Sequence, residues 1–290
     1  MSVIGESHLV GLIGSGVTES LTPLMHERVA DDLGIRYLYR PIDLTVIGRP
    51  ASDVGALLRE GRDVGYTAFN ITHPCKQIVL DHLDELSDAA HRLKAVNTVL
   101  VSDGRLIGHN TDHSGFLWGL EQGLAGAPME KIVQLGAGGA GTAVSYALLS
   151  AGAQSLQIMD VDDSKAEGLA TTMTQFFPGR EIAAIPAASL PTALAKADGL
   201  VNTTPIGMHL HPGLPLDEAL VHSGLWVADI VYRPLETELL RLAVQRGCRV
   251  LDGGYMAVGQ AVDTLQLITG VAPDFARLRA HFVDLIEQGK

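Results

Sequence analysis

A glycine-rich hexapeptide near the middle of the chain constrains its fold more than any other stretch. It reads Gly136-Ala137-Gly138-Gly139-Ala140-Gly141 and matches the pattern G-x-G-x-x-G. A predicted strand, residues 131–135, leads into it, an alanine-rich helix, residues 140–150, leads out, and Asp160 ends the next predicted strand. Glycines allow the tight turn and the close approach of a pyrophosphate, whose charge the helix N-terminus stabilises. The stretch therefore predicts the dinucleotide-binding turn of a Rossmann-type, doubly wound α/β domain.

Asp160 also predicts the coenzyme. A carboxylate at this position accepts hydrogen bonds from the two ribose hydroxyls of NAD and repels the extra phosphate of NADP, which normally requires an arginine. The residues that follow are Val161, Asp162 and Asp163, and the nearest cation is Lys165. NAD is therefore favoured over NADP. A glycine turn without any ligand is the structural alternative, and it would leave the acid at this position unexplained.

The chain is predicted to form two α/β domains, because 290 residues exceed what one core usually serves. Strands and helices alternate in the N-terminal part, which predicts a mostly parallel sheet with crossover helices. A Gly/Pro-rich break at residues 123–130 precedes the second unit, and residues 255–290 look helical without showing on which unit they pack. The other predicted strands are 8–13, 35–42, 65–71, 95–101, 106–109, 155–159, 181–184, 199–202 and 226–230; the other predicted helices are one from Thr22 that Gly34 closes, 54–60, one beginning near Pro74, and 164–176.

Charge and composition exclude several classes of partner. Acidic residues outnumber basic ones, 33 against 21, for a formal net charge of −12, so neither nucleic acid nor an anionic membrane is an expected partner. The sequence has no apolar run of membrane-spanning length and no secretion-signal pattern, so a cytoplasmic location is expected. No metal site or disulfide is predicted from Cys75 and Cys248 or from the pairs His109/His113 and His209/His211.

A dinucleotide domain makes a redox reaction the expected chemistry, and the first domain should then supply a proton-transfer group. The candidates are Lys76, in the stretch NITHPCKQ, and Asp112, in the stretch GHNTD. As hydride leaves an alcohol carbon, a Lys/Asp pair can share the hydroxyl proton. Burial would lower the pKa of the lysine and Asp112 would raise it, and the residues alone do not say which effect wins. A solvated Lys76 and an Asp112 that merely caps the helix through Trp118 are equally open.

A set of short motifs covers nearly the whole chain in a fixed order. The motifs are Ser20-Leu21-Thr22-Pro23, Asn70 to Lys76 (N-x-T-x-P-x-K), Ala95 to Thr98, Asn110 to Phe116 (N-T-D-x-x-G-F), the G-A-G-G from Gly136, Asn202 to Met208 (N-x-T-P-x-G-M), and Met256 with Gln260. Together they resemble the shikimate dehydrogenase family. Within the family, the chain is most similar to the bacterial quinate/shikimate dehydrogenases. This similarity lies in Thr22, the sequences NITHP and GHNTD, and Asp160.

The resemblance implies two α/β domains with the active site in the cleft between them. Residues 1–113 plus 255–290 would form a substrate-binding catalytic domain and residues 114–254 the Rossmann-type NAD-binding domain, whose closure would expel water. Lys76 and Asp112 would be the catalytic pair. The implied substrate-binding residues are Ser20, Thr22 and Tyr232 for a carboxylate and Thr72, Asn97 and Gln260 for ring hydroxyls; the implied coenzyme-binding residues are residues 136–141, Asp160, Thr203, Pro205, Met208, Gly253 and Met256.

Several of these roles have structural alternatives. Ser20 and Thr22 could cap the helix that follows, Asn97 and Gln260 could be buried polar residues satisfied by backbone, and Tyr232 could belong to the core. Two residues depart from the family pattern: Tyr255 stands where many members have glycine, and Cys75 replaces a larger, usually aromatic residue.

These features predict an NAD-dependent dehydrogenase that reversibly oxidises a ring hydroxyl of quinate and/or shikimate to the 3-dehydro product. One alternative is a dehydrogenase of an amino analogue, aminoshikimate or aminoquinate, and another is a strictly biosynthetic shikimate dehydrogenase. A non-catalytic NAD-responsive binding protein would be expected to have lost Lys76 or Asp112, and both are present. The expected partner is a small-molecule substrate. A homodimer is left open, as is the physiological direction, quinate catabolism or aromatic amino acid biosynthesis.

Overall fold

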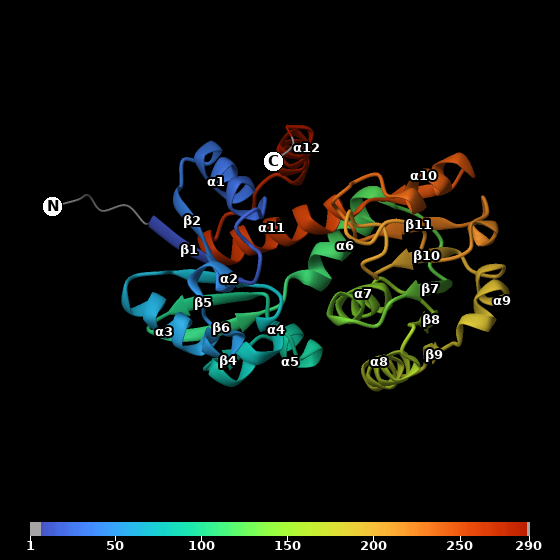
Figure 1. Cartoon of the computed structure of the whole chain (residues 1–290), viewed down its shortest axis with the longest axis horizontal. Coiled ribbons are helices and arrows are strands. Elements are labelled where there is room, and N and C mark those ends of the chain that lie inside the picture. The colour runs from blue at the N-terminus through green and yellow to red at the C-terminus, as the bar shows by residue number, and fades with distance from the viewer. Residues whose placement is uncertain (1–6, 289–290) are drawn as a thin grey trace. The chain divides into compact units, whose positions relative to one another are not determined.

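The computed structural model describes residues 7–288, and the chain divides into two compact units (Figure 1). The first unit comprises Met1–Thr111 with Gln260–Lys290, and the second comprises Asp112–Gly259. The chain enters the second unit at the beginning of α6 (Asp112–Gly123) and returns to the first within α11 (Gly253–Thr269). The family resemblance predicted these domain boundaries between residues 113 and 114 and between residues 254 and 255.

The first unit is built on a six-stranded mixed sheet with the order β2-β1-β3-β5-β6-β4. β1 pairs in parallel with β2 and β3, whereas β5 runs antiparallel to both β3 and β6. β4 pairs in parallel with β6, so the sheet is mostly parallel, as predicted, and β5 alone runs in the opposite direction. The sequence did not predict this reversal, which the two-residue turn Asp103-Gly104 makes between β5 and β6. Both turn residues have positive φ, 51° and 76°, the geometry that Asp-Gly favours in hairpins. The strands are β1 (Ser7–Gly14), β2 (Arg36–Asp43), β3 (Ala68–Ile71), β4 (Glu85–Leu86), β5 (Thr98–Ser102) and β6 (Arg105–His109).

The helices of the first unit bury apolar side chains against this sheet. Val54, Leu57 and Leu58 of α3 belong to one buried cluster with Phe69 and Ile71 of β3. The C-terminal segment, predicted only as helical, forms two helices, because Gly270 interrupts it with a φ of 74°. The helices are α1 (Thr22–Asp32), α2 (Leu44–Ile47), α3 (Val54–Asp63), α4 (Cys75–Ile78), α5 (Asp88–Leu93) and α12 (Phe275–Glu287, capped by Asp274), with 3₁₀ turns at Ala51–Asp53 and Val79–His82.

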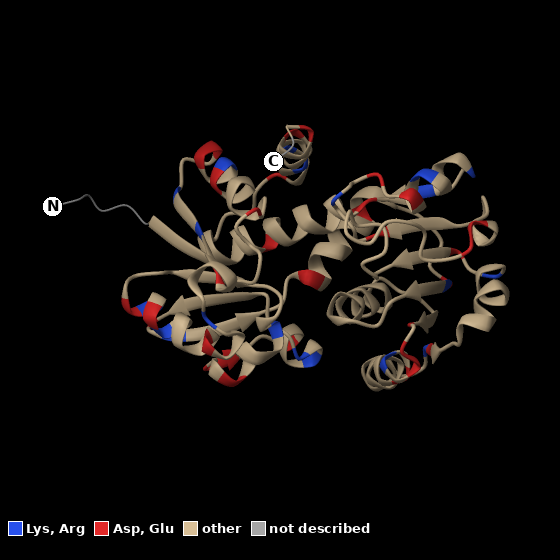
Figure 2. Cartoon of the chain, viewed as in Figure 1, with Lys and Arg blue, Asp and Glu red and all other residues tan. Residues whose placement is uncertain are grey.

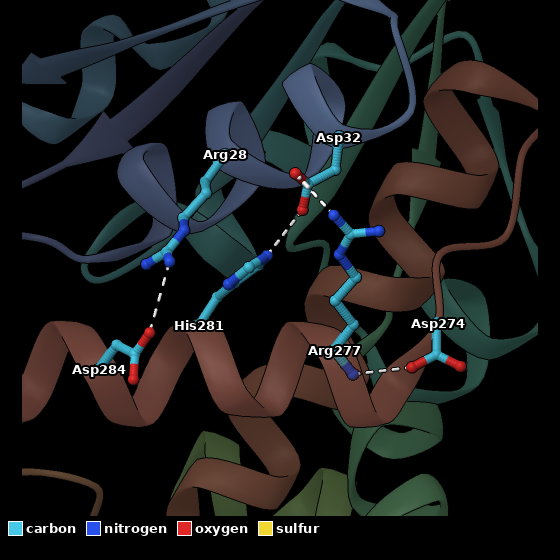
Figure 3. A network of polar contacts seen from close by, with 6 residues as sticks. All are labelled: Arg28, Asp32, Asp274, Arg277, His281 and Asp284. Carbon is cyan, nitrogen blue, oxygen red and sulfur yellow. Dashed lines mark hydrogen bonds and ion pairs between the residues drawn. The ribbon is translucent and has the colours of Figure 1, made fainter.

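Charged side chains fasten α12 to α1 (Figure 3). Asp32, at the end of α1, accepts a hydrogen bond from His281 Nε2 at 2.7 Å and pairs with Arg277 at 2.8 Å. A second pair joins Arg28 to Asp284 at 3.4 Å. The hydrogen bond from His281, together with Arg277, holds the pKa of Asp32 below its usual value. Although each exposed pair contributes little alone, the set ties the last helix to the first.

The second unit is built on an all-parallel six-stranded sheet with the order β12-β11-β10-β7-β8-β9, which confirms the predicted doubly wound domain. α7 and α8 cover one face and α9 and α10 the other (Figure 1). The predicted strands 155–159, 181–184 and 199–202 agree with the structure, whereas α10 and β12 were not predicted. The elements are β7 (Lys131–Leu135), α7 (Gly139–Ser150), β8 (Ser155–Met159), α8 (Asp163–Phe176), β9 (Glu181–Ala184), α9 (Leu190–Leu194), β10 (Gly199–Asn202), β11 (Trp226–Asp229), α10 (Glu238–Gln245) and β12 (Arg249–Leu251), with 3₁₀ turns at Ala187–Ser189 and Glu218–Leu220.

Figure 2 shows acidic and basic residues intermixed on the helices of both units. Within residues 7–288, none of the helices combines the length and the apolar character that crossing a membrane requires. The same described range holds no group of three or more His, Cys, Asp or Glu side chains placed to bind a metal ion. Cys75 and Cys248 are both buried as free thiols.

Candidate active site

The glycine turn lies between β7 and α7, and its geometry requires glycine. Gly136 has a φ of 98°, and a Cβ on Gly141 would lie 2.5 Å from the carbonyl oxygen of Gly136. At Gly138 and Gly139 an added Cβ would meet no atom within 4 Å, so this side of the turn is open. α7 begins here without any side-chain cap. The turn therefore fits a pyrophosphate, which the N–H groups of the first helical turn would hold.

Two buried polar residues brace the turn from behind. The Thr203 hydroxyl donates to the carbonyl oxygens of Leu135 at 2.8 Å and Gly136 at 3.0 Å. Gln134, fully buried on β7, donates from Nε2 to Gly136 O at 2.8 Å. Gln134 was not predicted, although a glutamine inside an otherwise apolar strand directly before the glycines was a usable signal. These contacts make the turn rigid before any ligand arrives.

Asp160 ties the turn to the end of β8. Its Oδ2 accepts from Ala137 N at 2.7 Å and its Oδ1 accepts from Asp162 N at 2.9 Å. Each oxygen of a carboxylate has two acceptor positions, so the second of each can receive a ribose hydroxyl. Lys165, the nearest cation in sequence, is paired with Asp162 at 3.8 Å. The hydrogen bond from Ser164 lowers the pKa of Asp162, which keeps a second negative charge beside Asp160.

The loop after β10 carries Thr203, Pro205 and Met208, three of the predicted coenzyme contacts. Asn202 shapes this loop from its buried position: its Oδ1 accepts from the hydroxyl of Thr204 at 2.7 Å, and its Nδ2 donates to Ile206 O at 3.0 Å. Met208 is 40% exposed, so its side chain can contact a ligand.

Near β11 and α11 lie the other predicted residues of the second unit. Tyr232 is 42% exposed, which contradicts the alternative that it belongs to the core. A Cβ on Gly253 would lie 2.3 Å from Ile230 O, so glycine is required there. Met256 is buried. Tyr255, the departure from the family pattern, lies beside Gly119, where an added Cβ would be 3.2 Å from the tyrosine Cβ.

In the first unit, Ser20 and Thr22 lie together at the start of α1. Ser20 Oγ accepts from Thr22 N and donates to Thr22 Oγ1, both at 3.2 Å. The N-cap position is occupied by Leu21, which makes no side-chain capping bond. The two hydroxyls thus form a local pair.

The ends of β3, β5 and β6 bring several of the predicted residues of the first unit together. Asn97 is buried; its Oδ1 accepts from Thr111 N at 2.8 Å and its Nδ2 donates to Thr111 Oγ1 at 2.9 Å. Thr72 and Lys76 are half-buried, after β3 and within α4, and the carbonyl of Lys76 accepts from Val96 N at 2.8 Å. Asn97 is thus a buried amide whose hydrogen bonds are satisfied, as the structural alternative expected. It also directly follows Val96, whose N–H is bonded to the backbone of Lys76.

Asp112 and Gln260 lie on the two helices through which the chain crosses between the units. Asp112 is buried, at 4% exposure, as the first residue of α6, and Gln260 is half-buried within α11. Cys75, beside Lys76, is fully buried, and burial raises the pKa of its thiol.

A buried hydrogen-bonded network, not predicted from the sequence, supports this region of the first unit. The hydroxyl of Tyr39 donates to Asn70 Oδ1, and Asn70 Nδ2 donates to Thr98 Oγ1 at 2.9 Å. Thr98 Oγ1 donates in turn to Asn97 Oδ1 at 3.2 Å. Because each group donates to the next, the amide of Asn97 is held in one orientation.

Comparisons with known proteins identify the family of the chain. The family model of the shikimate dehydrogenase substrate binding domain matches residues 12–99. A shikimate dehydrogenase (NADP(+)) of Pseudarthrobacter chlorophenolicus is 56% identical over 99% of this chain and 98% of its own. A quinate/shikimate dehydrogenase (NAD(+)) of Corynebacterium efficiens is 45% identical over 97% of this chain and 99% of its own. The solved structure of quinate dehydrogenase from Corynebacterium glutamicum in complex with NAD, 45% identical, superposes with a TM-score of 0.91 over 96% of this chain and 99% of that one. With relatives this similar over almost its full length, the chain belongs to the shikimate dehydrogenase family.

Proposed function

We propose that this oxidoreductase interconverts shikimate and its 3-dehydro product, that quinate is at most a secondary substrate, and that NAD is the preferred coenzyme. The observation that carries the coenzyme choice is the carboxylate of Asp160 at the glycine turn. The substrate choice rests on similarity alone. It revises the prediction from the sequence, which placed quinate beside shikimate.

Similarity to known relatives supports shikimate over quinate. The relative at 56% identity is named for shikimate, whereas quinate appears in the names at 45%. Similarity therefore favours the alternative of a shikimate dehydrogenase. The half-buried and buried hydroxyls and amides of the first unit suit a small polyhydroxylated acid, because a polar site left unpaired by a wrong substrate costs much affinity.

For the coenzyme, the names and the site point in opposite directions. The relative at 56% is named for NADP and those at 45% for NAD. Asp160, Asp162 and Asp163 put three carboxylates at the end of β8, and Lys165 is already paired with one of them. An additional phosphate at this point would face like charges at short range, each worth about 1 kcal/mol or more at 4 Å. The charge of the site therefore favours NAD.

In the proposed reaction, the bound coenzyme supplies the hydride acceptor. The residues of the chain bind the ring and take the hydroxyl proton: Ser20 and Thr22 hold the substrate carboxylate, and Lys76 with Asp112 accepts the proton as the C–H bond breaks and the carbonyl forms. In the reverse direction the pair returns the proton to the oxygen. Lys76→Ala is expected to lower kcat by roughly a hundredfold or more while coenzyme affinity stays near wild type. Near-normal turnover in that variant would remove Lys76 from the mechanism.

The coenzyme assignment is tested by a steady-state matrix of shikimate or quinate with NAD or NADP. We expect kcat/KM to be highest for shikimate with NAD. Asp160→Ala should lower the NAD to NADP ratio of kcat/KM by about tenfold, because it removes both the ribose acceptor and the repulsion. Damage to the turn itself would affect both coenzymes and cancel in this ratio.

Glu167→Ala is the matched control, since it removes an exposed acid from α8 that lies beyond the turn. Its coenzyme ratio should equal that of wild type. A wild-type preference for NADP, or an Asp160→Ala ratio no different from that of the Glu167→Ala control, would contradict the role given to Asp160.

A further inference from the structure

A buried carboxylate outside the predicted site ends β11. Asp229 is 2% exposed and accepts three hydrogen bonds. Asn202 Nδ2 and Val231 N donate to its Oδ1, both at 3.0 Å, and the Thr237 hydroxyl donates to its Oδ2 at 2.7 Å. None of the predicted catalytic, substrate or coenzyme roles uses this group.

The three donors come from three different segments of the second unit. Asn202 ends β10 and shapes the loop 203–208. Val231 directly precedes Tyr232. Thr237 is the N-cap of α10, where its Oγ1 accepts from Leu240 N at 3.3 Å. One carboxylate thus joins the loop after β10, the loop after β11 and the start of α10.

We propose that Asp229 is a positioning residue, whose ionised carboxylate fixes the two loops that present Thr203, Met208 and Tyr232 to coenzyme and substrate. This inference rests on the proposed function of those residues. The carboxylate is suited to the task because it accepts from all three donors at once. An amide in its place would have to donate to Thr237 Oγ1, and the hydroxyl proton of Thr237 would lose this acceptor.

The protonation of Asp229 should therefore matter at mildly acidic pH. Burial raises its pKa to about 6, opposed by the hydrogen bonds from Thr237, Val231 and Asn202. The groups that face it from β10 and α10, the Asn202 amide and the Thr237 hydroxyl, are neutral. The charged residues on the adjoining segments are Arg233, Glu236, Glu238 and Asp252, and none of them is among the causes of the shift.

The test compares wild type, Asp229→Asn and Asp198→Asn in the full chain, between about pH 5 and pH 9. Two quantities are measured: kcat/KM for shikimate, and the dissociation constant of the reduced coenzyme from its fluorescence. Asp198 is the matched control, because it precedes β10 at the opposite end and its Oδ2 likewise accepts a backbone N–H, from Lys131 at 2.8 Å.

We expect Asp229→Asn to lower kcat/KM roughly tenfold at about pH 8, since misplaced contacts are costly. We also expect wild type and Asp198→Asn to lose kcat/KM on acidification near pH 6, a loss absent from Asp229→Asn. A merely structural aspartate would not move this acid limb. Wild-type kcat/KM at alkaline pH in Asp229→Asn, or an acid limb unchanged in that variant, overturns the proposal.

Two further comparisons test the proposal if the first variant does not fold or wild type is inactive. If Asp229→Asn does not fold, Thr237→Ser should keep wild-type kcat/KM and Thr237→Val should lose it, and equal values in both overturn the proposal. If wild type oxidises neither shikimate nor quinate, the proposed function fails and the coenzyme dissociation constant alone decides. Weaker binding in Asp229→Asn and in acidified wild type then supports the positioning role, and unchanged binding refutes it.

Discussion

Each unit places a buried polar network at the ends of its central strands, and the two networks differ in charge. In the first unit the members are neutral: Tyr39, Asn70, Thr98 and Asn97 pass hydrogen bonds from one to the next. In the second unit the centre is a carboxylate, Asp229. A neutral network keeps its donors and acceptors at every ordinary pH, whereas a network built on an acid keeps them only while the acid is ionised.

Two titratable groups, Tyr39 in the first network and His26 beside it, illustrate the difference. Burial lowers the pKa of His26, whose Nδ1 lies 3.1 Å from the hydroxyl of Tyr37, to about 3. Burial raises the pKa of Tyr39 well above its usual value. The imidazole therefore stays neutral and the phenol stays protonated across the physiological range.

Asp229 behaves in the opposite way, and its ionisation lowers stability. Its pKa rises from 3.8 in the unfolded chain to about 6 in the folded one. The folded state thus binds more protons between these values, so the free energy of unfolding falls as the pH rises through this window. The loss is about 3 kcal/mol, at 1.36 kcal/mol for each unit of pKa. A carboxylate retained at such a cost is consistent with a role in activity.

The largest expected effect is this fall in the free energy of unfolding as the pH rises. Between about pH 4 and pH 7, the free energy of unfolding of wild type should fall by about 2.5 kcal/mol relative to that of Asp229→Asn, because the variant lacks the group whose ionisation is unfavourable. Urea denaturation at both pH values, with Asp198→Asn as the control, measures the change. A constant difference between variant and wild type would mean that the two networks are equally indifferent to pH.

A smaller effect is expected from the neutral network. Tyr39→Phe removes the donor to buried Asn70 and should cost about 1–3 kcal/mol of stability, with no dependence on pH between about 5 and 8. Tyr37→Phe, on the same strand, removes only the hydroxyl beside His26 and leaves the path to Asn97 intact. Tyr39→Phe should therefore also raise KM for shikimate, whereas Tyr37→Phe should not. Equal KM values in the two variants would show that the network does not reach the substrate.

The second unit was the more predictable half, for a physical reason. Its four inner parallel strands, β7, β8, β10 and β11, are largely buried on both faces, so they read as short apolar runs. The coenzyme turn is formed by consecutive residues. In the first unit, residue types do not encode strand direction, although Asp103-Gly104 was a readable hairpin signal. α10 was missed despite the apolar spacing of Leu239, Leu240 and Ala243.

The candidate site was predictable only where its residues belong to local motifs. Lys76, Asp160 and Tyr232 could be named because each stands in a short recognisable stretch. Tyr39 and Asp229 could not be assigned positions in the networks, because most of their partners are distant in sequence and meet them only after the sheets form. The supporting residues of a site are thus a product of the fold rather than of any local pattern.

The polar contacts between α1 and α12 bear on the order in which the two units can finish folding during synthesis. The second unit is one continuous segment, Asp112–Gly259. The first unit is completed by α12, which is synthesised only after the whole second unit. During synthesis, the whole second unit therefore follows α1 before Asp32 can contact Arg277 and His281. The half that carries the proposed catalytic lysine is started first and finished last.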